Sequence, residues 1–222
     1  MSATVLVTGP TGKVGRRLIP YLGRRGVAVR AASRSPVGAH AGIEPVRFDW
    51  TDKSTYETAR KGVEAMYLVP GPIPQSEHAD YVRALLDGAT GTGVKRVVLL
   101  SSYGVERAPP ENPLRRIELA VESSGVPYTI LRPVAFMQNF SEGLRWRESF
   151  AEGIRERDEI VGPGGGGIVS YVSTEDVAAV AVIALTKDGH GGKAYAPLGP
   201  EPLTLGQAVS YTHLTLPTIY SV

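Results

Sequence analysis

Three evenly spaced glycines make VTGPTGKVG, residues 7–15, the segment whose chemistry is clearest. Gly9, Gly12 and Gly15 follow a short apolar run and precede a segment with helical periodicity. In a strand–loop–helix unit, such glycines permit a tight turn, bring the backbone close to a pyrophosphate and let the helix pack on the strand. The helix N-terminus adds N–H groups and a partial positive charge. The spacing therefore predicts a dinucleotide site near the start of the chain.

Lys13 raises the alternative of a mononucleotide P-loop, which the sequence does not fit. The GxxxxGK[ST] pattern would need glycine in place of Val7 and serine or threonine in place of Val14. Lys13 either lies near phosphate or is a solvated residue of the first helical turn, and both readings stay open.

The end of the second predicted strand indicates which dinucleotide binds. NAD sites place an acidic residue there to bind the ribose diol, but no Asp or Glu lies between Leu6 and Glu44. The stretch is RAASRSP, residues 30–36, and it offers Arg34 where a 2′-phosphate would lie. A guanidinium matches phosphate geometry as a fork. The sequence favours NADP(H) over NAD(H); otherwise Arg34 is only a surface charge.

The segment FDW, residues 48–50, follows the third predicted strand. Asp49 can accept a hydrogen bond from an adenine amino group while Trp50 packs on the ring. Asp49 can equally cap the helix predicted to begin at Thr51, and the sequence does not decide between these roles.

Short β-branched runs alternate with helical patterns up to residue 131. Strands are predicted at 4–8, 27–33, 44–48, 65–69, 94–101 and 128–131, and helices at 13–26, 51–61, 76–90 and 112–123. This alternation predicts an α/β fold, a Rossmann-type doubly wound parallel sheet with right-handed crossovers. We expect residues 1–133 to form the NADP-binding domain.

The pattern changes after Pro133, where we expect a partial substrate lobe over residues 134–207, interleaved with the core. Helices are predicted at 139–152 and 174–186, and a strand at 193–197. The segment IVGPGGGGIVSYV, residues 160–172, indicates two short strands around a glycine-rich turn. A second phosphate loop is the weaker reading because no helix follows the glycines at once.

The last fifteen residues, AVSYTHLTLPTIYSV at 208–222, differ in composition from the rest. They lack the helical period that TLGQAV begins, and they resemble a translated transposon sequencing adapter. We therefore expect 208–222 to be an artefactual tail that replaces a native C-terminus; a genuine C-terminal strand is the alternative.

Composition excludes several classes of function. The chain has 222 residues, no cysteine and a formal net charge of +2, so thiolate chemistry is excluded and no basic block indicates nucleic acid. The longest C-terminal apolar run, residues 177–185, is too short to span a bilayer. His40 and His78 lie in no metal-ligand pattern, and no G-x-S-x-G elbow occurs. We expect a cytoplasmic protein without membrane, metal or nucleic-acid partners.

Taken together, these motifs resemble the NmrA-like branch of the atypical short-chain dehydrogenases/reductases. The resemblance covers residues 3–206 and is carried by VTGPTGKVG, ASRSP, FDW, VVLLSSYG, ESSGVPYTILRPVAFMQNF and VSYVSTEDVAAVA. It implies a Rossmann core with a small C-terminal lobe. It also implies cofactor contacts from Gly9, Thr11, Gly12, Val14, Gly15, Arg34, Asp49, Trp50, Val69, Pro70, Gly71, Ser101, Ser102 and Tyr103. Pro133 and Phe136 should line the nicotinamide, and Asn139 and Phe140 should face the substrate.

The chain departs from the superfamily at its usual catalytic pair. Reductases of this superfamily use Tyr-x-x-x-Lys on the helix after the fifth strand, but here Pro110 and Leu114 occupy those positions. YGVER, residues 103–107, has tyrosine and arginine at that spacing, but in a loop. Arginine cannot be tuned as lysine can, so we interpret this pair as chance. Ser102 and Tyr103 are the remaining candidates for donating a hydrogen bond to a substrate carbonyl.

Two functions follow from the resemblance. The first is hydride transfer from NADPH to a quinone or another small carbonyl electrophile, which needs little proton assistance. The second is a redox sensor that binds NADP(H) and a protein partner without turnover. A sugar epimerase or classical ketone reductase is weakened by Pro110 and Leu114.

Overall fold

The computed structural model describes residues 3–36, 42–71, 77–143, 150–157 and 167–215. The chain divides into two compact units. The first comprises Met1–Pro133 and Glu175–Ala196, and the second comprises Val134–Thr174 and Pro197–Val222.

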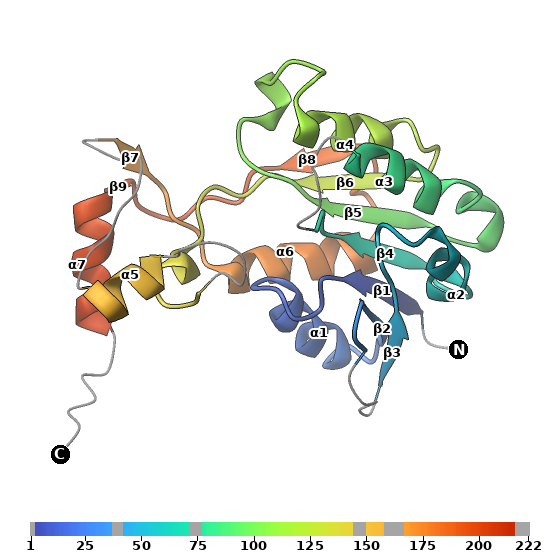
Figure 1. The fold of residues 1–222 in the computed structure, drawn as a ribbon, viewed down its shortest axis with the longest axis horizontal. Coiled ribbons are helices and arrows are strands. Elements are labelled where there is room, and N and C mark those ends of the chain that lie inside the picture. The colour runs from blue at the N-terminus through green and yellow to red at the C-terminus, as the bar shows by residue number, and fades with distance from the viewer. Residues whose placement is uncertain (1–2, 37–41, 72–76, 144–149, 158–166, 216–222) are drawn as a thin grey trace. The chain divides into compact units, whose positions relative to one another are not determined.

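The first unit is built on a seven-stranded sheet in the order β3-β2-β1-β4-β5-β6-β8, shown in Figure 1. The strands are β1 (Thr4–Thr8), β2 (Ala28–Ser33), β3 (Ile43–Arg47), β4 (Ala65–Leu68), β5 (Arg96–Leu100), β6 (Tyr128–Leu131) and β8 (Lys193–Tyr195). Every neighbouring pair runs parallel. The order reverses between β1 and β4, and open α/β sheets bind their ligands at the carboxyl ends beside such a reversal.

Helices cover both faces of this sheet, as a doubly wound fold requires. They are α1 (Gly15–Gly23), α2 (Tyr56–Arg60), α3 (His78–Leu86), α4 (Pro113–Glu122) and α6 (Thr174–Thr186), with 3₁₀ turns η1 (Lys53–Thr55), η2 (Thr90–Thr92) and η3 (Val105–Arg107). Figure 1 shows α3 and α4 on one face and α1 and α6 on the other. Beneath α3 and α4, Leu85 and Ile117 join Met66 and Leu99 in a buried cluster.

The predicted fold class is confirmed, and three elements have the predicted bounds. The strands at 4–8 and 128–131 and the helix at 174–186 have the predicted bounds. Predicted helices were too long: 13–26 is reduced to α1, and 76–90 is divided into α3 and η2. Gly88 separates the last two because it adopts a positive φ of 68°, a conformation that a continuous helix does not allow.

The second unit contains η4 (Met137–Asn139), α5 (Phe150–Arg157), α7 (Leu205–Thr215) and a two-stranded antiparallel sheet of β7 (Ile168–Val169) and β9 (Leu203–Thr204). The helix predicted at 139–152 is wrong at 140–143, which are not helical, and correct at 150–152, where α5 begins; 144–149 lie outside the described residues. The Gln138 side chain accepts from Thr174 N–H at 2.9 Å and donates to Ser173 Oγ at 3.2 Å, which holds this segment as a short turn.

The hairpin predicted at 160–172 is only partly visible, because 158–166 lie outside the described residues. Its second strand, β7, pairs with β9 from much later in the chain. Gly199 permits this long-range arrangement: its N–H donates to Ser170 O at 3.2 Å, and a Cβ there would lie 1.9 Å from Tyr171 O.

The C-terminal segment differs from the sequence expectation as well. The sequence of 208–222 lacks a clear helical period, yet α7 continues to Thr215. Thr204 and Gln207 cap its start reciprocally, with Gln207 N–H donating to Thr204 Oγ1 at 3.2 Å and Thr204 N–H donating to Gln207 Oε1 at 2.9 Å. Ala208 is buried in the core of this unit. Residues 216–222 are outside the described part, and the adapter origin of the tail stays a prediction.

No helix within the described ranges combines the length and apolar character needed to cross a membrane.

Candidate functional site

The glycine loop lies between β1 and α1, beside the reversal of the sheet. Gly9 has a φ of +63°, and its carbonyl oxygen accepts from Gly12 N–H at 3.0 Å. A Cβ on Gly15 would lie 2.2 Å from the same oxygen. Glycine is therefore required at these two positions for different reasons: at Gly9 by the backbone angle, and at Gly15 by the close packing of α1 on the loop. Thr11 and Gly12 are exposed on the loop, and Val14 is buried beneath it.

The loop is tied to the end of β4. The Thr8 hydroxyl donates to Tyr67 O at 3.2 Å and accepts from Val69 N–H at 2.8 Å. A Cβ on Gly9 would contact Val69 at 3.5 Å. The structure thus brings together the two segments predicted to flank the dinucleotide, the loop and Val69–Gly71.

The helix that follows the loop is anchored at its exposed face. Glu175 of α6 accepts from Arg17 Nε at 2.7 Å and from Tyr21 OH at 2.6 Å. Arg17 also donates to Lys13 O at 2.8 Å. These bonds fix the first turns of α1, whose N-terminus faces the predicted pyrophosphate. Lys13 itself is half-buried.

Arg34 is exposed immediately after β2. Among the residues that the structure describes, no hydrogen bond or ion pair occupies its guanidinium. By contrast, Arg47, at the end of β3 opposite Ser33, lies 3.4 Å from Asp52. At the carboxyl end of β2, next to β1, the Arg34 guanidinium is therefore available to bind an anion. No acidic side chain lies on β2 itself.

Asp49 and Trp50 have structural partners of their own. The Asp49 carboxylate accepts from Thr51 N–H at 3.0 Å and from Thr51 Oγ1 at 2.9 Å, in a turn that precedes the helix. The N-cap is Asp52, whose side chain accepts from Ser54 N–H at 3.2 Å, so the capping role suggested for Asp49 belongs to Asp52. The Trp50 indole is buried edge-on against Phe48 at 4.9 Å, and a Cβ on Gly71 would lie 3.2 Å from it. Trp50 thus packs against Gly71 and supports the 69–71 loop. Contacts of Asp49 and Trp50 with adenine stay predictions.

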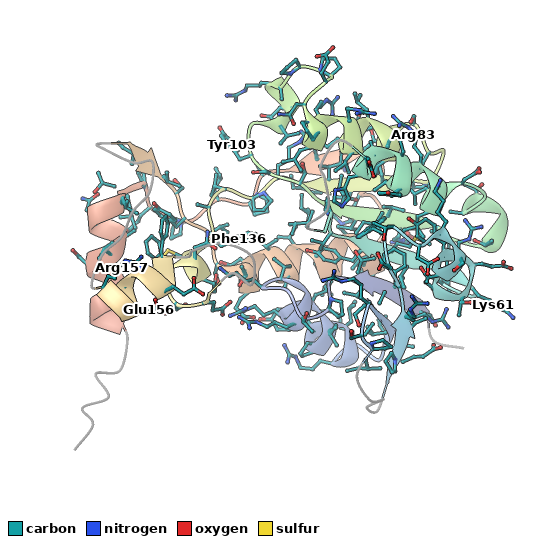
Figure 2. The ribbon with its side chains drawn as sticks, viewed as in Figure 1. Lys61, Arg83, Tyr103, Phe136, Glu156 and Arg157 are labelled. Atoms are coloured by element: carbon teal, nitrogen blue, oxygen red, sulfur yellow. The ribbon has the colours of Figure 1, made fainter. Side chains whose placement is uncertain are left out.

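Ser101, Ser102 and Tyr103 follow β5 and are held to the end of β6. Ser101 N–H donates to Leu131 O at 2.7 Å, and Tyr103 N–H donates to Pro133 O at 3.0 Å. Tyr103 is 48% exposed, and the Arg107 guanidinium carbon lies 5.9 Å from the centroid of its ring. Figure 2 shows Tyr103 projecting from this loop. The structure thus brings Tyr103 beside Arg107, although we interpreted their spacing in the sequence as chance.

The helix that normally carries Tyr-x-x-x-Lys does not provide it here. Pro110 is exposed and precedes α4, whose N-cap is Asn112, while Leu114 packs against the core. Asn112 accepts from Leu114 N–H at 3.0 Å, which fixes the helix start after Pro110.

Sequence reasoning missed the charged cluster below these loops. Glu118 of α4 is fully buried and bonds to Ser101, Arg115 and Arg132. Burial raises the pKa of Glu118, but hydrogen bonds from Arg132, Ser101 and Arg115 outweigh it and leave that pKa below its ordinary value. The sequence did contain a signal for this cluster: a charged residue, Glu118, at a core position of the helix beside Ile117 and Val121.

In the second unit, Phe136 forms a parallel bridge with Val172, and Asn139 ends η4. Phe140 is 2% exposed and stacks on Phe150 at 5.2 Å between ring centroids. The structure gives Phe140 a packing role in this unit. Substrate contact by Asn139 and Phe140, and nicotinamide contact by Phe136, stay predictions.

No three His, Asp or Glu side chains come close enough to hold a metal ion in the described part of the chain. The donor set that the structure does assemble is a glycine loop, a helix N-terminus and an arginine, which fits a phosphorylated dinucleotide.

Comparison with known proteins decides the family. A model of the NAD(P)H-binding family matches residues 9–188. The chain belongs to the NmrA-like family of NAD(P)H-binding oxidoreductases. A family relative from Streptomyces griseus, a (4-alkanoyl-5-oxo-2,5-dihydrofuran-3-yl)methyl phosphate reductase, is 39% identical over 207 residues, which cover 90% of this chain and 69% of the relative.

Two further proteins similar to this chain are informative. The NAD(P)H azoreductase of Xenophilus azovorans is 30% identical, over 96% of this chain and 77% of its own. The solved structure of an NADPH-dependent quinone oxidoreductase from Escherichia coli, in complex with NADPH, superposes with a TM-score of 0.76 at 25% identity. It covers 94% of this chain and 75% of that one.

Proposed function

We propose that this protein transfers hydride from NADPH to a conjugated small electrophile, with a quinone as the best-supported acceptor class. The observation that carries the nucleotide preference is Arg34, which is exposed at the carboxyl end of β2 with no ion pair among the described residues. The acceptor class is supported by similar proteins whose names specify an azoreductase and a quinone oxidoreductase.

In this proposal the first half of the sheet binds the adenosine end and the second half presents the nicotinamide. The glycine loop and α1 hold the pyrophosphate, and Arg34 binds the 2′-phosphate as a fork. Loops 69–71, 101–103 and 133 surround the nicotinamide end, because β4, β5 and β6 end there. The bound cofactor supplies the hydride.

The chain's own contribution at the reacting end is orientation and a proton. A quinone that accepts a hydride becomes a hydroquinone anion, and one proton completes the hydroquinone while NADP⁺ remains. Tyr103, exposed and with Arg107 over its ring, is the side chain proposed to donate a hydrogen bond to the acceptor oxygen. Ser102 is exposed beside it and is the second donor.

The second candidate function is a redox sensor that binds NADP(H) without turnover. The observation that favours it is the replacement of the usual catalytic pair by Pro110, which lies outside α4, and Leu114, which packs on the core.

One experiment separates the two functions. The protein is mixed with NADPH and menadione, a simple quinone, and nicotinamide fluorescence is followed against a protein-free control. An immediate change followed by faster decay than the control supports the reductase. An immediate change that then stays constant, repeated with an azo dye as acceptor, supports the sensor. No change on adding NADPH contradicts both.

A further inference from the structure

A buried carboxylate joins α4 to the carboxyl ends of β5 and β6. Glu118 accepts from Ser101 Oγ at 2.6 Å, from Arg115 Nη1 at 2.8 Å, and from Arg132 Nε and Nη2, both at 2.9 Å. Arg132 therefore binds both oxygens of the carboxylate as a fork. Three segments of the first unit converge on this one side chain.

The cluster has little freedom to rearrange. The Glu118 side chain is 0% exposed, and those of Arg132 and Arg115 are 14% and 20% exposed. A buried charge is tolerated only when it is paired and hydrogen-bonded, so each partner is held in place by the cost of leaving the carboxylate alone. Replacing a buried ion pair by well-packed apolar residues is often neutral or stabilising, so we attribute to this cluster the role of specifying one arrangement.

That arrangement includes both loops at the predicted nicotinamide end. Ser101 leads directly into Ser102 and Tyr103, and Arg132 leads into Pro133. The two loops are also joined to each other, since Tyr103 N–H donates to Pro133 O at 3.0 Å. A displacement of Glu118 would therefore reach the exposed ends of both loops through Ser101 and Arg132.

We propose that Glu118 is a positioning residue that fixes the nicotinamide-binding loops. This inference rests on the proposed function, because it takes loops 101–103 and 133 to bind the nicotinamide end. Glu118 lies one helical turn after Leu114, on the helix that carries Tyr-x-x-x-Lys in similar reductases. In this chain, α4 would thus contribute to the reaction by holding loops 101–103 and 133 in place, through the bonds from Glu118 to Ser101 and Arg132.

The arrangement of the sheet gives this proposal a sharp consequence. Arg34 follows β2, on the adenosine side of β1, whereas the Glu118 cluster lies at β5 and β6, on the other side of the reversal. Loss of Glu118 should weaken binding of the whole dinucleotide and leave binding of its adenosine end unchanged. A general loss of folding would instead weaken both together.

The test compares two ligands on three proteins by isothermal titration calorimetry. The ligands are NADPH and adenosine 2′,5′-bisphosphate, which is the adenosine end alone. For Glu118→Gln, Kd for NADPH should rise about tenfold and Kd for the bisphosphate should stay within about twofold. Glu122→Gln is the matched control: Glu122 also binds Arg115, at 2.8 Å, but within the described ranges it makes no hydrogen bond or ion pair to the end of β5 or β6. Both affinities of that variant should stay within about twofold of the wild type.

Each other result counts against a stated part of the proposal. Equal weakening of both ligands, or no change in either, by Glu118→Gln would overturn the positioning role. If Glu118→Gln does not fold, Arg132→Lys takes its place, because it keeps the charge but loses the fork. An unchanged ratio of the two Kd values in Arg132→Lys would overturn the proposal too. If the wild type binds neither ligand, the proposed function itself fails.

Discussion

The carbonyl oxygen of Gly9 occupies the place where a side chain on Gly15 would begin. A Cβ built on Gly15 would lie 2.2 Å from Gly9 O, 3.1 Å from Gly9 C and 3.2 Å from Pro10 Cα. These are backbone atoms, which cannot swing aside as the end of a flexible side chain can. The third glycine of the loop is therefore required by packing in the protein itself, before any nucleotide binds.

Gly15→Ala should consequently displace the loop and weaken NADPH binding by at least about tenfold. We also expect it to lower the free energy of unfolding by about 1–3 kcal/mol, the usual cost of overpacking. Gly23→Ala is the control in the same helix, because a Cβ there meets nothing within 4 Å. It should stabilise the protein by about 0.5–1 kcal/mol. Urea denaturation and NADPH titration measure both, and wild-type behaviour of Gly15→Ala would contradict the packing argument.

The glycine loop was predictable because its signal is local. Spacing and the flanking strand and helix patterns were enough to place it, and the same holds for the fold class, since strand and helix alternate up to residue 131. What spacing did not reveal is that Thr8 ties the loop to β4 through Tyr67 and Val69. That contact depends on strand order.

The Glu118 cluster and the strand pairing within the second unit were missed for a physical reason. Glu118, Ser101 and Arg132 are separated in sequence and meet only because β5 and β6 are neighbours. Likewise β7 pairs with β9 from much later in the chain. The start of α7 differs, because the capping pair Thr204 and Gln207 is a local signal that the sequence analysis overlooked. Long-range contacts decided the Glu118 cluster and the β7–β9 pairing, and local patterns do not encode such contacts.

Arg34→Asp should change nucleotide preference. The substitution replaces the guanidinium with a like charge beside the 2′-phosphate, so Kd for NADPH should rise about 100-fold while Kd for NADH changes only a few-fold. Arg83→Asp on α3 is the control for the change in net charge; Arg83 pairs with Asp80 at 2.6 Å. Fluorescence titrations at one fixed ionic strength measure these constants. Equal weakening of NADPH and NADH binding would defeat the assignment of Arg34.

Tyr103→Phe tests the proposed hydrogen-bond donor. It removes only the hydroxyl, so kcat for menadione should fall about tenfold to 100-fold, while Kd for NADPH stays within about threefold. Tyr81→Phe is the control, because that hydroxyl donates to Glu77 on the surface at 2.8 Å. Steady-state kinetics and NADPH titration separate the two effects. An unchanged kcat in Tyr103→Phe would show that the proton comes from another source, such as water.

His78 makes stability depend on pH. The side chain is 1% exposed at the start of α3, with its ring 6.2 Å from that of Trp50. Neither ring nitrogen has a hydrogen-bond partner among the residues that the structure describes. Burial therefore lowers the pKa of His78 below its ordinary value of 6.5. As the pH falls below 6.5, His78 in the unfolded chain takes up a proton before His78 in the folded protein does. The folded state then loses stability relative to the unfolded state.

His78→Leu removes both the proton site and the two unpartnered nitrogens. At about pH 8, where the imidazole is neutral in both states, the variant should be as stable as the wild type or more stable, since burying an unpaired polar group is costly. Towards about pH 5, the wild type should lose stability that the variant keeps, so the difference between them should widen in favour of the variant. Urea denaturation at several pH values measures this difference. Parallel stability curves for the two proteins would mean that His78 is not the group responsible, and that its ring is solvated in the folded protein.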